Sequence, residues 1–146
     1  MTMKTKDLLK KIDHDRVIRA IRDAEARTSG EVRVFVSTTK PTDPVAAARA
    51  EFVRLNMHQT AERNGVLLFI APRSQGLAIV GDTAVHEHIG DTGWRRIIDA
   101  MLARCREGQF TEALLYGIEQ VAGVLAEHSP RKHDDRNELS DKVETG

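Results

Sequence analysis

The strongest constraint in this sequence is a run of six apolar residues, Val66 to Ala71, that follows the turn signal Asn64-Gly65. Because every position is apolar, a β-strand formed by this run would have two faces that both avoid water. Such a strand lies in the middle of a sheet with helices on each side. The run is also far shorter than the roughly 20 residues that a helix needs to span a bilayer, so no transmembrane segment is expected.

The segments around this run predict a small mixed sheet. Glu31 to Thr38 places valine at every second position, the period of two that is typical of a strand. Pro72 to Gly76 turns the chain into the apolar segment Leu77 to Val80, which predicts an antiparallel hairpin with the central strand. A helix from Pro44 to about Leu55 separates the first two strands, and we therefore expect them to be parallel.

Apolar residues at helical spacing predict three more helices. The first begins at Asp13 or Asp15 and ends before Gly30. The other two, Gly93 to Cys105 and Phe110 to Leu125, each carry one apolar stripe, and the intervening glycine favours a helical hairpin that covers one face of the sheet. We expect an α/β protein, a three-layer α/β/α sandwich with a small mixed sheet flanked by helices.

A chain of 146 residues has the length of one ordinary domain. We expect residues 1–12 to be an N-terminal extension, residues 13–130 to form the α/β domain, and residues 131–146 to be a polar, disordered tail, because they contain almost no apolar side chains. The N-terminus shows no signal-peptide pattern, and a single cysteine, Cys105, fits a reducing compartment. These observations predict a soluble, cytoplasmic protein.

Charge and aromatic residues argue against a nucleic-acid partner. The 22 Lys and Arg residues are balanced by 22 Asp and Glu residues, so the whole protein has no field that attracts a polyanion. The aromatic side chains lie mostly on the predicted core stripes and not beside basic clusters, as a base-stacking surface would require.

The segment richest in chemistry is Gly81 to Asp91, which carries three carboxylates and two imidazoles. Asp82 and Asp91 are candidates to hold a divalent cation, Ca²⁺ or Mg²⁺, or to activate water, and His86 is a candidate acid or base. A structural alternative stays open, in which Asp82 caps a short helix, Asp91 caps the helix that contains Trp94, and His86 is a surface residue.

Two arginines are candidates for anion binding. Arg63, with Asn64 beside it, and Arg33 could each hold a phosphate or carboxylate through forked guanidinium donors. The alternative, and the more common role of such an arginine, is a tie between segments of the fold or a solvated charge. Cys105 lies on an apolar stripe, and Thr111 stands where cysteine phosphatases need an arginine, so we expect Cys105 in the core. The common nucleotide-binding and serine-hydrolase motifs are absent from the sequence.

The order of these landmarks resembles the TPM domain family, in its short stand-alone form, over about residues 13 to 130. The matching stretches are Ala24-Glu25-x-x-Thr28-Ser29-Gly30-Glu31-Val32-Arg33-Val34, then Arg63-Asn64-Gly65 with the strand that follows, Gly81-Asp82 with His86, Trp94, Met101, Gly108-x-Phe110 and Gly117-Ile118. The resemblance implies an α/β/α sandwich. It also brings disparate roles, since relatives include thylakoid-lumen proteins with suggested acid phosphatase activity and divalent-ion binding, and a membrane protein that modulates an acetylcholine receptor.

Two hypotheses follow from the resemblance and the loop chemistry. The first is a phosphate-monoester hydrolase of the TPM type, acid-phosphatase-like, with a divalent-cation-assisted site at the carboxyl ends of the strands. Its catalytic residues would be Asp82, His86 and Asp91, its metal ligands Asp82 and Asp91, and its substrate-binding residues Arg63, Asn64 and Arg33. The alternative is a non-catalytic protein-interaction or regulatory module linked to membrane or envelope complexes. The expected ligand is thus a phosphate ester or a protein partner.

Overall fold

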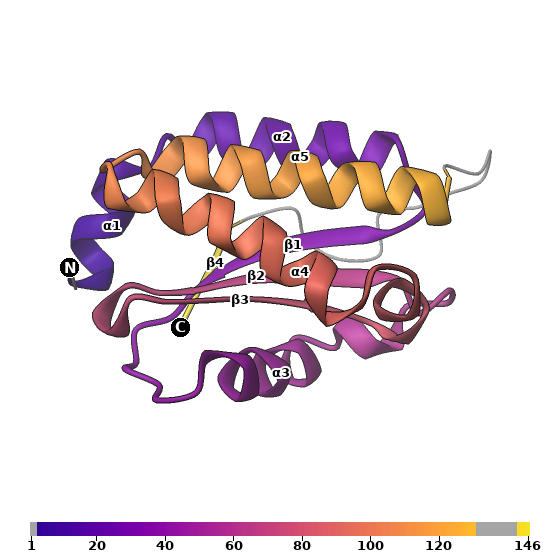
Figure 1. The fold of residues 1–146 in the computed structure, drawn as a ribbon, viewed down its shortest axis with the longest axis horizontal. Coiled ribbons are helices and arrows are strands. Elements are labelled where there is room, and N and C mark those ends of the chain that lie inside the picture. Colours follow the sequence, from indigo (N-terminus) through magenta and orange to yellow (C-terminus); the bar gives the residue numbers. More distant parts are fainter. Residues whose placement is uncertain (1–2, 131–142) are drawn as a thin grey trace.

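The structure is a computed structural model that describes residues 3–130 and 143–146. Within these residues the centre is a mixed sheet with strand order β3-β2-β1-β4 (Figure 1). β1 is parallel to β2 and to β4, and β2 is antiparallel to β3. The α/β class and the directions predicted for the first three strands are confirmed. The strands are β1 (Glu31–Val36), β2 (Gly65–Ala71), β3 (Gly76–Gly81) and β4 (Val143–Thr145).

Helices cover both faces of the sheet, as the apolar central strand predicted. In Figure 1, α2, α4 and α5 lie on one side of the sheet and α3 lies on the other. Among the described residues, none of the helices is long and apolar enough to cross a membrane. The α-helices of this part of the chain are α1 (Thr5–Lys11), α2 (His14–Ala26), α3 (Pro44–Arg54), α4 (Thr83–Arg106) and α5 (Phe110–His128).

The sheet separates two apolar clusters, and the period of two decides which residue joins which cluster. Val34 of β1 and Leu68 of β2 pack with α2, α4 and α5. Phe35 and Phe69, each one position further along, face α3, where their rings stack with centroids 5.7 Å apart. Both strands are therefore enclosed on both faces.

Two segments form regular structure where the sequence predicted none. α1 lies within the segment expected to be an extension, and its Leu8 and the following Ile12 are only 2% and 6% exposed, because residues four apart share one helix face. β4 lies within the expected polar tail, and its Val143 pairs with Val34 of β1. The remainder of that tail, residues 131–142, lies outside the described residues.

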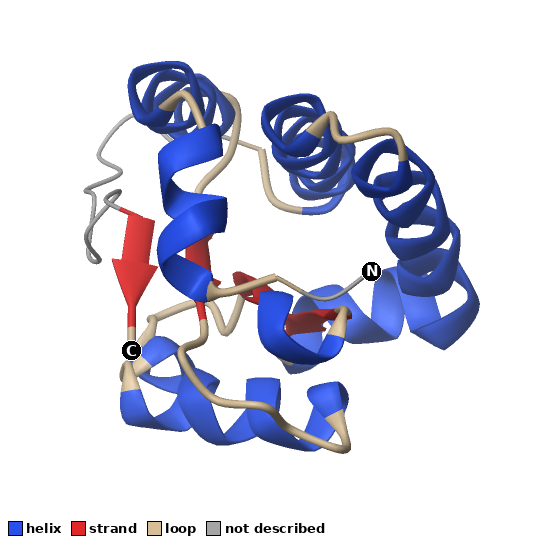
Figure 2. Ribbon diagram, turned by 90° about the vertical axis from the view of Figure 1, so that its left-hand side faces the viewer, coloured by secondary structure: helices blue, strands red, loops and turns tan. Residues whose placement is uncertain are grey.

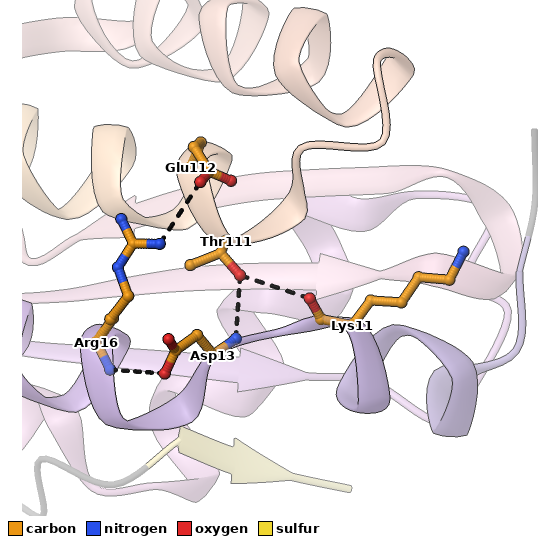
Figure 3. A network of polar contacts seen from close by, with 5 residues as sticks. All are labelled: Lys11, Asp13, Arg16, Thr111 and Glu112. Atoms are coloured by element: carbon orange, nitrogen blue, oxygen red, sulfur yellow. Dashed lines mark hydrogen bonds and ion pairs between the residues drawn. The ribbon is translucent and has the colours of Figure 1, made fainter.

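A polar joint holds α1 and α2 against the start of α5 (Figure 3). The hydroxyl of Thr111 accepts a hydrogen bond from the amide of Asp13 at 3.0 Å and donates one to the carbonyl of Lys11 at 3.5 Å. Arg16 forms an exposed ion pair with Glu112 at 3.5 Å. The joint fixes the position of α1 beside α5, with Leu8 and Ile12 turned to the core.

Glycines shape the predicted helical hairpin at two places. Gly90 interrupts α4 with φ 71° and ψ 172°, and Gly108 takes φ 76° in the turn between α4 and α5. Both conformations lie in the region that side chains with a Cβ rarely adopt. α4 is therefore two helical sections joined by a bend, followed by a tight return into α5, and the hairpin prediction is confirmed.

Two glycines within α5, Gly117 and Gly123, provide a matched test of core packing. A Cβ at Gly117 would lie 2.5 Å from Sδ of Met101 and 2.9 Å from Cδ2 of Leu68, both buried, whereas a Cβ at Gly123 would meet no atom within 4 Å. Both Gly→Ala changes gain similar helix propensity, about 1 kcal/mol. We expect the free energy of unfolding of Gly117→Ala to be about 1–3 kcal/mol below that of Gly123→Ala in urea denaturation. Equal values would contradict the tight packing of α5 on α4.

Candidate functional site

Four of the candidate residues gather at one end of the sheet, the right-hand end in Figure 1. They are Arg63, before β2, and Asp82, His86 and Asp91, after β3. Because β3 runs antiparallel to β2, its carboxyl end lies beside the amino ends of β1 and β2, and the amide of Asp82 donates to the carbonyl of Gly65 at 2.9 Å. The expected position at the carboxyl ends of the strands therefore holds for β3 and not for β1 or β2.

Arg63 and Asp82 form a two-pronged ion pair at this end. Nε of Arg63 lies 2.9 Å from Oδ2 of Asp82, and Nη2 lies 3.1 Å from Oδ1. Oδ1 also accepts the amide of Thr83 at 2.7 Å, at the start of α4. Both oxygens of this carboxylate are engaged, and its side chain is only 4% exposed. The Asp82 cap that the structural alternative predicted is present, and the tie through Arg63, which the sequence left open, is also present.

The pair acts on Arg63 as well as on Asp82. The hydrogen bond to Asp82, together with the charge of that carboxylate, raises the pKa of Arg63 above its ordinary value. The backbone of Arg63 has φ 53°, and its carbonyl accepts the amide of Ala84 at 3.3 Å. A residue with a Cβ pays for such a conformation, so the surrounding contacts must hold it. About half of the Arg63 side chain remains exposed.

His86 connects the two sections of α4 across the bend at Gly90. The indole Nε1 of Trp94 donates to Nδ1 of His86 at 3.2 Å, and Nε2 of His86 lies 3.6 Å from Oδ1 of Asp91. Since an indole N–H can only donate, Nδ1 must be the acceptor, which places the proton of the neutral ring on Nε2. Asp91 is 92% exposed.

Asn64 belongs to a neighbouring polar cluster that joins the beginnings of β1 and β2. Its side-chain amide donates to the hydroxyl of Ser29 at 3.1 Å and to the carboxylate of Glu62 at 3.2 Å. Ser29 in turn donates to Glu62 at 2.5 Å. Asn64 is 1% exposed, so its amide serves this cluster. Sequence reasoning missed the roles of Ser29 and Glu62, because they meet only once the two strands pair.

Arg33 lies apart from the other candidates. It is the third residue of β1, in register with Leu67, and it is only 7% exposed. By the alternation of the strand its side chain points to the side of α3, opposite to Val32 and Val34. The structure therefore brings Arg63, Asp82, His86 and Asp91 together, and leaves Arg33 enclosed in the sheet.

The donors at this end do not match a cation site. No group of three or more His, Cys, Asp or Glu side chains in the described residues is arranged to hold a metal ion. Divalent Ca²⁺ and Mg²⁺ need several oxygen ligands, and the Asp82 oxygens already accept hydrogen bonds from Arg63 and Thr83. Asp82 and Asp91 as they stand do not fit a divalent cation.

Cys105 lies far along α4 and half-buried, packed against the larger apolar cluster. Burial raises the pKa of its thiol above the ordinary value, so the thiolate is disfavoured. This agrees with the predicted packing role.

The Asp82 pair can be tested against its exposed neighbour. We expect Asp82→Ala to lower the free energy of unfolding, with loss of the cap alone costing about 0.5–2 kcal/mol. Asp82→Asn keeps an acceptor for the Thr83 amide and should fall between Asp82→Ala and the wild type. The control is Asp91→Ala, which should stay within about 0.5 kcal/mol of the wild type because the side chain is exposed. Similar losses for Asp82→Ala and Asp91→Ala in chemical denaturation would show that the pair is not structural.

Comparisons with known proteins agree with this architecture. BA42, a protein of the psychrophilic bacterium Bizionia argentinensis, is 34% identical, with a TM-score of 0.82, covering 91% of this chain and 92% of that one. The N-terminal domain of a P. gingivalis protein is 19% identical, with a TM-score of 0.59, covering 91% and 99%, and shares the fold. No curated protein matches the sequence. The model of the TPM domain matches residues 3–124, a range that includes α1, and the chain therefore belongs to the TPM domain family.

Proposed function

We propose that this chain is a non-catalytic interaction domain that binds a partner protein through the exposed parts of Arg63, His86 and Asp91, called here the polar edge. The observation that carries this proposal is the engagement of Asp82. Its two oxygens hold Arg63 and cap α4, and its side chain is 4% exposed. A carboxylate used in this way stabilises the fold, and catalysis would require it to leave these partners.

The position of His86 supports the same proposal. To act as a general acid, its imidazole would carry protons on both ring nitrogens. A proton on Nδ1 would remove the acceptor of the Trp94 indole, whose side chain is 4% exposed. The buried N–H would then lose its partner, which costs free energy. The contact with the indole gives His86 a positioning role toward Trp94.

The polar edge has the exposure that recognition of a partner needs. The side chains of Arg63, His86 and Asp91 are 51%, 42% and 92% exposed, and they present charges of both signs. Arginine is enriched where proteins bind one another, and complementary charges select the partner and its orientation. A regulatory role at a membrane or envelope complex is the form of this function that the family resemblance favours. We also propose that the protein is cytoplasmic, because Cys105 is a free thiol and a reducing compartment keeps thiols free.

Phosphate-monoester hydrolysis is the second candidate. It is favoured by one observation, the convergence of a guanidinium, an imidazole and two carboxylates, one of them buried, at one end of the sheet. Nη1 of Arg63 is not used by Asp82 and could meet a phosphoryl oxygen. In this candidate His86 would transfer the proton, and Asp82 would have to separate from Arg63 before taking part.

One pair of assays separates the two functions. We expect purified protein to give no turnover of an aryl phosphate above the rate without protein, with or without Mg²⁺, Mn²⁺ or Ca²⁺. We also expect a photocrosslinking side chain at position 91 to capture a specific partner in cells, and the same side chain at exposed position 99 of α4 to capture none. Turnover that falls on His86→Ala without loss of thermal stability would decide for the hydrolase.

A further inference from the structure

An apolar cavity lies at the opposite end of the sheet from the polar edge. Its volume is about 360 Å³, and it is bordered by the end of β2, the start of β3, α1 and the hairpin of α4 and α5. This is the left-hand end in Figure 1 and the side that faces the viewer in Figure 2. Nearly all of its lining is apolar, including Leu8, Ile12, Ala71, Leu77, Met101 and Leu114.

Both the size and the place of this cavity are typical of a ligand site. Protein interiors contain few voids larger than a water molecule, whereas small-molecule sites occupy about 300–1,000 Å³ and are mostly apolar. The cavity lies at the carboxyl end of β2, which is where open α/β sheets bind their ligands. The polar edge lies at the other end of that strand.

Basic side chains lie at and near the cavity. Arg106 lines it and is exposed, and its side chain makes no hydrogen bond or ion pair within the part of the chain that the structure describes. Nζ of Lys11 lies 5.9 Å from the ring of Phe110, which also lines the cavity. Met3 borders both the cavity and a shallow hollow on α1, whose charged lining residues are Lys4, Asp7, Lys10 and Lys11.

We propose that this cavity binds a single-chain aliphatic carboxylate, with the hydrocarbon chain inside and the carboxylate beside Arg106. An apolar lining rewards the burial of hydrocarbon, and a forked guanidinium at the rim matches a carboxylate. A volume of about 360 Å³ lies near the lower end of the range for small-molecule sites, which favours a chain of medium length over a long one. The ligand is therefore a medium-chain fatty acid. The site is independent of the polar edge and of the function proposed for it.

The walls of the cavity are held in place by contacts already described. The Thr111 joint fixes α1 beside α5 (Figure 3). The turn at Gly108 returns the chain from α4 to α5. The pocket therefore exists before a ligand enters it, which lowers the cost of ordering on binding.

Cys105 provides a direct reporter, because its half-buried thiol lines the cavity. We expect dodecanoate, below its micelle-forming concentration, to slow alkylation of Cys105 by iodoacetamide at pH 8 at least about tenfold at saturation, because the chain covers the sulfur. Dodecanol carries the same chain without the charge and should require a roughly 2- to 5-fold higher concentration, as expected for an exposed ion pair. Butanoate, which is too short to fill the cavity, should give no protection.

Matched variants test the orientation of the ligand. Arg106→Gln should raise the dodecanoate concentration needed for half-protection roughly 2- to 5-fold and leave that of dodecanol unchanged. Arg96→Gln is the control, since Arg96 is also exposed on α4 but does not line the cavity. Leu102→Trp should fill the cavity and remove protection by both ligands. If Leu102→Trp does not fold, the comparison of the wild type with Arg106→Gln and Arg96→Gln still tests the proposal.

Two outcomes would overturn the proposal. An alkylation rate of wild-type Cys105 that dodecanoate does not change would rule out the cavity as its site. Equal half-protection concentrations for dodecanoate and dodecanol, unchanged by Arg106→Gln, would rule out recognition of the carboxylate at Arg106.

Discussion

This end of the molecule depends on the hydrogen bonds and the ion pair of the buried Asp82 carboxylate. Asp82 directly follows β3, and its side chain caps α4 and binds Arg63, which precedes β2. Beside it, Asn64 and Ser29 join the beginnings of β2 and β1, and the amide of Ser29 donates to the carbonyl of Ser129 at 3.0 Å, just past α5. Sequence landmarks that lie far apart along the chain thus form two neighbouring hydrogen-bonded clusters. The polar residues at these positions are explained by their structural role, because a buried polar group must have hydrogen-bond partners.

Most of the fold could be predicted because burial is encoded in local periodicity. The apolar run of β2 and the stripes of α4 and α5 each specify their own element. α1 has only seven residues, about two turns, which is too short to show a helical repeat of apolar positions. β4 has three residues that become a strand only by pairing with β1. Structure that depends on a distant partner leaves no local signal.

The candidate site could be predicted in part. The gathering of Arg63 with Asp82 was a consequence of the hairpin, since the end of an antiparallel strand lies beside the start of its partner. The same topology places this site at the amino ends of the parallel strands β1 and β2. Analogy with other open α/β sheets instead predicts the carboxyl ends. The two-pronged bond and the indole contact of His86 depend on side-chain geometry, which spacing does not encode. A cavity is harder still to predict from sequence, because it forms where side chains from several elements together leave space unfilled.

The short strand β4 has a consequence for how the protein behaves in concentrated solution. Beyond Thr145, the amide of Gly146 donates to the carbonyl of Val36 at 3.2 Å, and the carbonyl of Gly146 accepts the amide of Thr38 at 2.6 Å. Together with the β4 ladder, these bonds occupy backbone groups at the end of β1 and at Thr38 just beyond it, which would otherwise form a free sheet edge. Free edges recruit strands from other molecules and begin aggregates. β4 is now the edge strand on this side of the sheet, and with three residues it offers a shorter edge for pairing than the six residues of β1.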